Sequence, residues 1–208
     1  LEEDEKELLK RENLKKEDSN IDEKKDINTI RIDLKDVLKS KIQAFEQLQY
    51  KKDLVDIYHD GSKTLEEKLE AINRLNLPSI NTKSFRDNEL QLELSGYKGF
   101  ITALIHLDEK PLTAYEILRR LNQNKPNHQY LINMLRAYYE AYKDDVNKKE
   151  KFEHIITEYK RLEDKVENYE KELYDYQILL ALYADIDDFK SFSELWSELP
   201  KVYYYDLY

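Results

Sequence analysis

The chain has 208 residues, of which 38% are charged and 40% hydrophobic, and its 44 acidic against 34 basic side chains give a net charge of −10. It contains no Cys, which excludes disulfide frameworks, thiolate metal sites and cysteine nucleophiles. Its three Gly are too few for the turns of a β-sandwich. No apolar run approaches the roughly 18 residues that span a bilayer. A chain this acidic is also a poor match for bare nucleic acid. We therefore expect a soluble, all-α, intracellular protein with an interaction role.

Residues 1–34 are expected to form a charged N-terminal segment and linker, partly disordered or helical. Of the first 28 residues, 18 are charged, 11 of them acidic and 7 basic. The apolar positions Leu1, Leu8, Leu9 and Leu14 have a heptad-like spacing that raises the alternative of a coiled coil. So few heptads do not hold a supercoil, and this favours a solvated tail.

From about residue 35 onwards the apolar residues recur at helical spacing, which predicts pairs of helices joined by short turns. In the first pair Asp60-Gly61 is a turn signal, and Thr64 followed by Glu67 is the pattern of a helix-opening capping box. In the second pair Pro111 suits the first position of a helix. We expect four helical hairpins in a domain that covers 35–208, with approximate bounds 35–78, 84–126, 128–163 and 170–200.

Three prolines close the second helices of these pairs, and their spacing predicts a repeat. Pro78, Pro126 and Pro200 lie 48 and 74 residues apart, and 74 is twice 37. Helix pairs that recur every 34 to 47 residues or so are typical of α-solenoids, in which each hairpin buries its apolar face only by stacking on its neighbours.

The last hairpin and residues 112–126 resemble a tetratricopeptide or pentatricopeptide repeat. In 112–126, Ala114 stands at the family's small packing position, Leu118 at the large apolar position, and Pro126 where the family has its closing proline. No unit carries the family's full first-helix signature of Trp, Leu-Gly and Tyr. The resemblance implies stacked antiparallel hairpins in a right-handed α-solenoid, similar to scaffolds that bind peptides or partner proteins.

Catalytic and metal-binding patterns fail one by one. The segment Gly61-Ser62-Lys63-Thr64 is similar to the end of a phosphate-binding loop, but it lacks the earlier glycine and the preceding strand. The segment Asp185-Ile186-Asp187-Asp188 is similar to the start of a calcium-binding loop, but Phe189 stands where that loop needs a ligand. The four histidines are far apart and have no His or Cys at helical spacing, so we interpret them as helix-end or surface residues. We expect no enzyme activity, no cofactor and no metal site.

The candidate binding residues are aromatic and basic. Thirteen of the 17 tyrosines lie at or beyond Tyr130; they are interpreted either as solenoid core or as a partner surface, because Tyr is enriched in binding hot spots. Tyr139 and Tyr142 fall away from the apolar stripe of their helix, and Arg119-Arg120 form a local basic cluster. These four residues are our candidate partner-binding site.

The function that the sequence favours is a protein-interaction scaffold or adaptor subunit of a larger complex, binding a peptide or helical segment of a partner. Two alternatives stay open: a single-stranded RNA-binding protein of the pentatricopeptide kind, which the acidic charge disfavours, and the sensor arm of a larger regulatory protein. The chain begins at Leu1 and ends in an aromatic run, so we expect that the solenoid continues in a longer protein. We expect a cytoplasmic location, with a nuclear or organellar one left open.

Overall fold

The computed structural model describes residues 36–78, 85–167 and 169–203. All of their regular structure is helical, with no strand in these three ranges, so the all-α prediction is confirmed. The segment predicted over 1–34 lies outside the described residues. The chain divides into two compact units, 1–49 and 50–208.

In the first unit, residues 36–49 are helical, and most of their side chains are exposed to solvent. The sequence predicted one apolar face along this helix. The structure places the five apolar side chains of that face in solvent, with exposed fractions of 51–68%: Val37, Leu38, Ile42, Phe45 and Leu48. Periodicity identifies residues that share a face, but it does not say whether another element covers that face.

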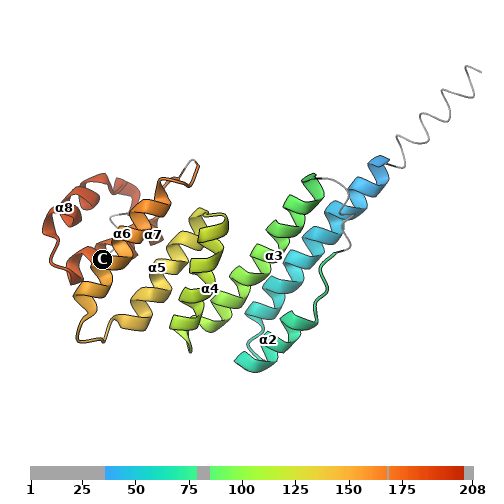
Figure 1. The fold of residues 1–208 in the computed structure, drawn as a ribbon, viewed down its shortest axis with the longest axis horizontal. Helices are drawn as coiled ribbons and strands as arrows, with labels where there is room; N and C mark the ends of the chain where they lie inside the picture. The colour runs from blue at the N-terminus through green and yellow to red at the C-terminus, as the bar shows by residue number, and fades with distance from the viewer. Residues whose placement is uncertain (1–35, 79–84, 168, 204–208) are drawn as a thin grey trace, which may run out of the picture. The chain divides into compact units, whose positions relative to one another are not determined.

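The second unit begins with helical residues 50–59 and continues with seven α-helices and a short 3₁₀ turn, η1 (Lys201–Tyr203). The α-helices are α2 (Leu65–Arg74), α3 (Phe85–His106), α4 (Pro111–Asn124), α5 (His128–Tyr142), α6 (Lys148–Glu163), α7 (Leu173–Asp185) and α8 (Phe189–Glu198) (Figure 1). From α2 to α8 each helix contacts the next one along the chain, and α5 also contacts α7.

Local side chains set where these helices begin. The Thr64 hydroxyl accepts from the Glu67 amide at 3.2 Å, and the Glu67 carboxylate accepts from the Thr64 amide at 2.8 Å, which confirms the predicted capping box at α2. Pro111 is the first residue of α4, as expected of a residue without an amide hydrogen. The carboxylate of Asp188 accepts from the Ser191 amide at 3.0 Å and caps α8.

The core of the unit lies along α5, α6 and α7. On α5 the predicted apolar stripe is confirmed, since Leu131, Met134 and Leu135 are fully buried and Tyr138 nearly so. The same holds on α6 for Phe152, Ile155 and Leu162. Helix α8 contributes less than its sequence pattern predicts, because Leu195 is its one buried side chain and Phe189 is 67% exposed.

A close approach of α3 and α4 depends on a glycine. A Cβ atom placed on Gly99 would lie 3.3 Å from a terminal methyl carbon of Leu121, which is tighter than ordinary van der Waals contact. The missing side chain therefore lets Leu121 pack directly against the α3 backbone. This contact explains why a residue that weakens a helix interior stands in the middle of α3.

We predict that Leu180→Asp abolishes cooperative unfolding of the second unit. Leu180 is buried in α7, and an unpaired carboxylate there costs at least about 3 kcal/mol. Urea unfolding followed by circular dichroism measures the change in free energy. The matched control is Gln177→Asp, on the exposed side of the same helix, which should stay within about 0.5 kcal/mol of the parent chain.

Candidate partner-binding surface

A pocket of ≈ 370 Å³ opens where the turn between α3 and α4 meets α5. Its lining comes from three places: the turn, the first residue of α4, and the C-terminal half of α5. The lining residues are Leu107, Asp108, Pro111, Arg136, Glu140 and Lys143. Two acidic and two basic side chains thus line the pocket together with Leu107 and Pro111.

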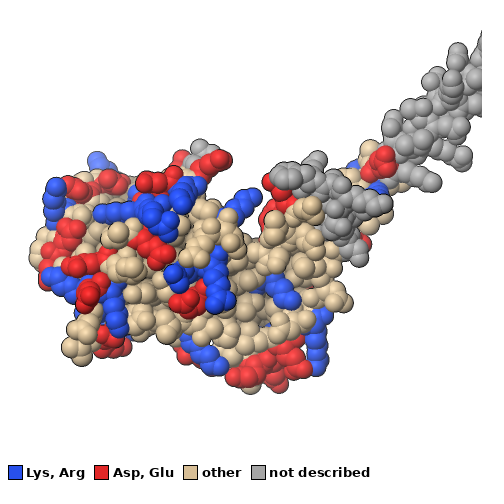
Figure 2. Space-filling model, in the orientation of Figure 1, with Lys and Arg blue, Asp and Glu red and all other residues tan. Residues whose placement is uncertain are grey.

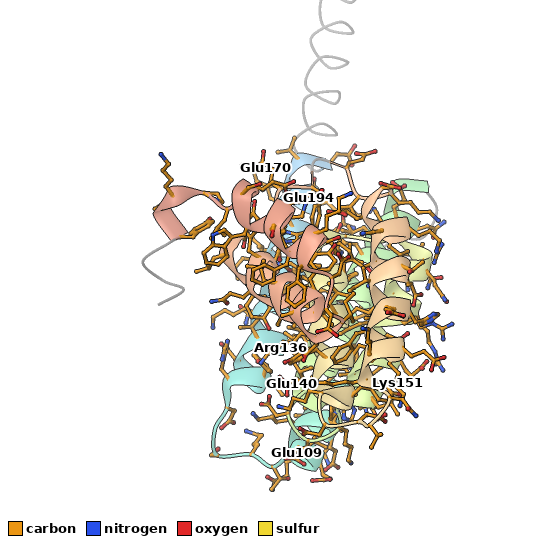
Figure 3. The ribbon with its side chains drawn as sticks, turned by 90° about the vertical axis from the view of Figure 1, so that its left-hand side faces the viewer. Glu109, Arg136, Glu140, Lys151, Glu170 and Glu194 are labelled. Carbon is orange, nitrogen blue, oxygen red and sulfur yellow. The ribbon has the colours of Figure 1, made fainter. Side chains whose placement is uncertain are left out.

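One cation of this pocket has no carboxylate partner among the described residues. The Lys143 ammonium pairs with the Glu140 carboxylate at 2.7 Å, so these two charges neutralise each other. Arg136 lies one turn from Glu140 on α5 (Figure 3), and no carboxylate of the described residues lies within ion-pair distance of its guanidinium group. Arg136 is therefore available to an anionic group of a ligand.

The aromatic ring of Tyr174, at the start of α7, lies beside this cation. The Arg136 guanidinium carbon is 5.8 Å from the ring centroid, within the range of a cation–π contact. Tyr174 is 40% exposed, so its ring also offers a free edge to a ligand. Burial raises the pKa of the Tyr174 hydroxyl, and the positive charge of Arg136 opposes this rise. The hydroxyl therefore remains a neutral hydrogen-bonding group at physiological pH.

Of the residues predicted to bind a partner, Arg119 is held in an ion-pair network. Its guanidinium group lies 3.8 Å from the Glu158 carboxylate of α6 and 3.6 Å from that of Glu116. Glu158 also lies 3.9 Å from Arg161 and 3.4 Å from the Tyr115 hydroxyl. The neighbouring Arg120 is exposed on α4.

The structure brings Tyr142 into the same series of contacts as Arg119. The Tyr142 ring lies 4.7 Å from the ring of Tyr138, which lies 4.7 Å from that of Tyr115. On its other side Tyr142 carries the Lys151 ammonium 4.0 Å from its ring centroid. A connected set of aromatic and charged side chains therefore links α4, α5 and α6.

Tyr139 packs elsewhere than Tyr142. Its ring stacks on Phe152 with a centroid distance of 5.3 Å and an interplanar angle of 19°, and Phe152 is fully buried. The Tyr139 side chain is half-buried, and burial raises the pKa of its hydroxyl, with the nearby Asp185 carboxylate adding to the rise. Its position off the apolar stripe therefore does not leave it free in solvent.

The sequence did not reveal a close contact between His128, at the start of α5, and the buried carboxylate of Asp175, at the start of α7. His128 Nε2 lies 2.6 Å from the Asp175 carboxylate, which is 1% exposed and also accepts from the Glu172 amide at 2.9 Å. Burial raises the pKa of Asp175, and the hydrogen bonds from Glu172 and His128 oppose the rise. His128 is a helix-end residue, as the sequence indicated, but its partner lies 47 residues away and no local pattern marks it.

A second polar network lies next to this pair. The Tyr159 hydroxyl is 3.0 Å from the Glu163 carboxylate and 2.9 Å from the Tyr169 hydroxyl, and Lys171 pairs with Glu163 at 3.2 Å. Tyr169 therefore donates to Tyr159, which donates to Glu163. Burial raises the pKa of both tyrosines, so both keep their hydrogen. The network joins Tyr169 and Lys171, which precede α7, to the C-terminal end of α6, where the sequence showed only a charged stretch.

The charged side chains of the second unit are mixed in sign. Figure 2 shows acidic and basic groups next to one another over the face in view. Within the described ranges, no group of three or more His, Asp or Glu side chains has the arrangement that holds a metal ion. Across the same residues, every helix is too short or too polar to traverse a lipid bilayer.

Comparisons with protein-family models, with curated proteins and with solved structures find no match to this chain. The fold and the surfaces described above therefore rest on the residues and geometry of the chain itself.

We predict that His128→Ala destabilises the second unit by about 2 kcal/mol at pH 7, because it leaves a buried carboxylate without its partner. A carboxyl whose pKa is raised by burial stabilises the folded state at pH values below its unfolded pKa of about 3.9. This contribution to the unfolding free energy is lost as the pH rises through the pKa of the carboxyl in the folded state. The deficit of the variant should therefore be largest at neutral pH and shrink toward pH 4. Urea unfolding across this pH range measures it, with the exposed His154→Ala as control. A deficit that grew on acidification would contradict this assignment.

We predict that Tyr139→Ala costs about 2 kcal/mol of unfolding free energy, because it removes a ring stacked on a fully buried Phe152. Tyr139→Phe keeps the stack and should cost much less. Urea denaturation of both variants checks the difference. An alanine variant as stable as the parent chain would show that the ring is an exposed surface group.

Proposed function

We propose that this chain is a non-enzymatic protein-interaction scaffold or adaptor that binds a peptide or helical segment of a partner in the pocket beside Arg136. We propose further that its helix pairs form a right-handed α-solenoid of the tetratricopeptide-like kind, with α3, α5 and α7 as the first helices of successive pairs. The partner segment would then lie along these first helices.

The packing of the helices supports the solenoid part of the proposal. Each helix from α2 to α8 contacts the next, and α5 contacts α7 beyond the helix between them. In a solenoid every repeat contacts only its neighbours, and equivalent helices of adjacent repeats lie side by side. The contact between α5 and α7 fits this arrangement.

The observation that carries the binding proposal is the guanidinium group of Arg136, which has no ion pair with a described carboxylate and lies beside the partly exposed ring of Tyr174. Arg and Tyr are among the residue types most enriched at energetically important interface positions. Arg136 lines the pocket together with the partly exposed Pro111 and the nearly buried Leu107. A partner segment with a carboxylate for Arg136 and an apolar side chain for the pocket matches this surface.

The described ion pairs favour a protein partner over RNA. Binding to a nucleic-acid backbone needs cations that are free to neutralise phosphates. In the Arg119-Arg120 cluster, Arg119 is instead paired with Glu158. The lysines around the start of α6 are paired as well: Lys148 with Asp185, Lys149 with Asp187, and Lys151 with Asp145.

We predict that Arg136→Glu weakens partner binding at least tenfold, because it places a like charge against the partner's anionic group. The partner is first recovered by affinity purification of the intact chain from its own cells, with and without nuclease, and its affinity is then measured with the purified variants. The variant loses the contact of Arg136 with the Tyr174 ring and places a second carboxylate one turn from Glu140, so urea unfolding should find it destabilised by no more than about 1–2 kcal/mol and still folded.

The matched control is Arg120→Glu, the same change at an exposed arginine on α4, outside the pocket. It should leave affinity within about twofold of the parent value. Loss of binding in Arg120→Glu but not in Arg136→Glu would move the site to the predicted basic cluster. Recovery of RNA that is lost at high salt would instead support the pentatricopeptide alternative.

A further inference from the structure

Asp175, in the first turn of α7, is the one carboxylate that is fully buried in the part of the chain that the structure describes. Its side chain is 1% exposed, and it accepts from the Glu172 amide at 2.9 Å. On α5, His128 Nε2 lies 2.6 Å away and is, within the described ranges, the one basic group at ion-pair distance from this carboxylate. The charge of Asp175 is therefore balanced by a single side chain, which belongs to another helix.

Around this contact, histidine is the one residue type that ordinarily changes its charge between pH 5 and 8. The neighbouring titratable side chains are Tyr169 and Glu172 before α7, and Tyr174 and Tyr176 on α7 itself. Burial raises the pKa of the three tyrosines, so they stay neutral over this range. Further out, Glu163 of α6 is paired with Lys171 at 3.2 Å. The charge of Glu198, at the end of α8, acts on Tyr176.

The contact has two charge states that differ in their cost to the fold. With one titratable proton shared between His128 and Asp175, the buried pair has no net charge. Once this proton leaves, a net negative charge remains at a buried site, and burying an uncompensated charge is destabilising. Burial raises the pKa of Asp175, and the hydrogen bonds from Glu172 and His128 oppose the rise without cancelling it. Because the folded pKa is raised, the stabilisation is present at low pH and is lost as the pH rises.

The first turn of α7 joins this contact to the proposed binding surface. The Tyr176 amide donates to the Glu172 carbonyl at 3.2 Å and closes the turn. Tyr174 lies in the same turn, directly before Asp175, and its ring centroid is 5.8 Å from the Arg136 guanidinium carbon. A turn that is held less firmly at Asp175 therefore also holds Tyr174 less firmly beside Arg136.

We propose that the His128–Asp175 contact is a pH-sensitive latch on the first turn of α7, closed in mildly acidic solution and loosened as the pH rises toward 8. With the latch closed, Tyr174 is held beside Arg136, and the pocket is ready to bind. With the latch loosened, the affinity of the pocket for a partner falls. The effect on binding rests on the function proposed above, whereas the latch itself is a property of this chain alone.

Hydrogen exchange of the intact chain, followed by NMR and corrected for the intrinsic exchange rate at each pH, tests the latch. The protection of the Tyr176 amide should be about tenfold higher at about pH 5.5 than at about pH 8. The matched control is the Phe192 amide, which donates to the Asp188 carbonyl at 3.0 Å in the first turn of α8. Its protection should change by less than about twofold.

Two variants assign the pH dependence to this contact. Asp175→Asn keeps the shape of the side chain and an oxygen that accepts hydrogen bonds, but it has no charge to gain or lose. His128→Gln is polar and neutral at every pH. In both variants the protection of the Tyr176 amide should be the same at the two pH values within about twofold. Circular dichroism checks that each variant is folded.

Two results would overturn the latch. In the first, the protection of the Tyr176 amide in the parent chain is the same at both pH values. In the second, it changes as much in Asp175→Asn as in the parent chain. Both results are obtained without a partner, so they do not depend on the proposed function.

The effect on binding is tested with the partner recovered by affinity purification. Its affinity for the parent chain should fall about tenfold between about pH 5.5 and about pH 8, and it should stay constant for Asp175→Asn. An affinity that Arg136→Glu lowers but pH leaves unchanged would overturn the regulation of the pocket. If Arg136→Glu instead binds as well as the parent chain, the pocket itself is contradicted, and the exchange result for the latch still stands.

Discussion

The arrangement of the second unit depends on α5 being covered on several sides at once. This helix packs against α4, α6 and α7, and six of its fifteen residues are buried. A helix shared by three neighbours must be apolar around most of its circumference, and the buried residues from Leu131 to Tyr138 meet that demand. One strip of α5 is left uncovered, and it carries Arg136, Glu140 and Lys143, so the pocket is the part of α5 that the core does not use.

Polar contacts, rather than apolar packing alone, position α7 against this helix. The His128–Asp175 pair joins the first turns of α5 and α7, and the Tyr169–Tyr159–Glu163 chain holds the connection from α6. Tyr174, the immediate neighbour of Asp175, is thereby placed where its ring meets Arg136. The His128–Asp175 contact thus links the stability of the fold to the geometry of the proposed binding surface.

The chain carries a net charge of −10, yet many charged groups of the second unit are paired with one another, such as Arg119 with Glu158 and Lys148 with Asp185. Arg136 is instead in contact with the ring of Tyr174, and no ion pair with a described carboxylate holds it.

The sequence by itself determined the helical class, the apolar stripes, and the helix starts at Thr64 and Pro111, because these depend on residues a few positions apart. It did not determine which stripes are covered: those of α5 and α6 are buried, whereas Phe189 and the stripe of residues 37–48 are exposed. It placed Tyr139 and Tyr142 off the main stripe, but only the tertiary structure showed that Tyr139 stacks on Phe152 and that Tyr142 packs at a tilt against Tyr138. The His128–Asp175 pair joins residues 47 positions apart. A contact across that separation exists only after the helices have packed, and this is why no local pattern could reveal it.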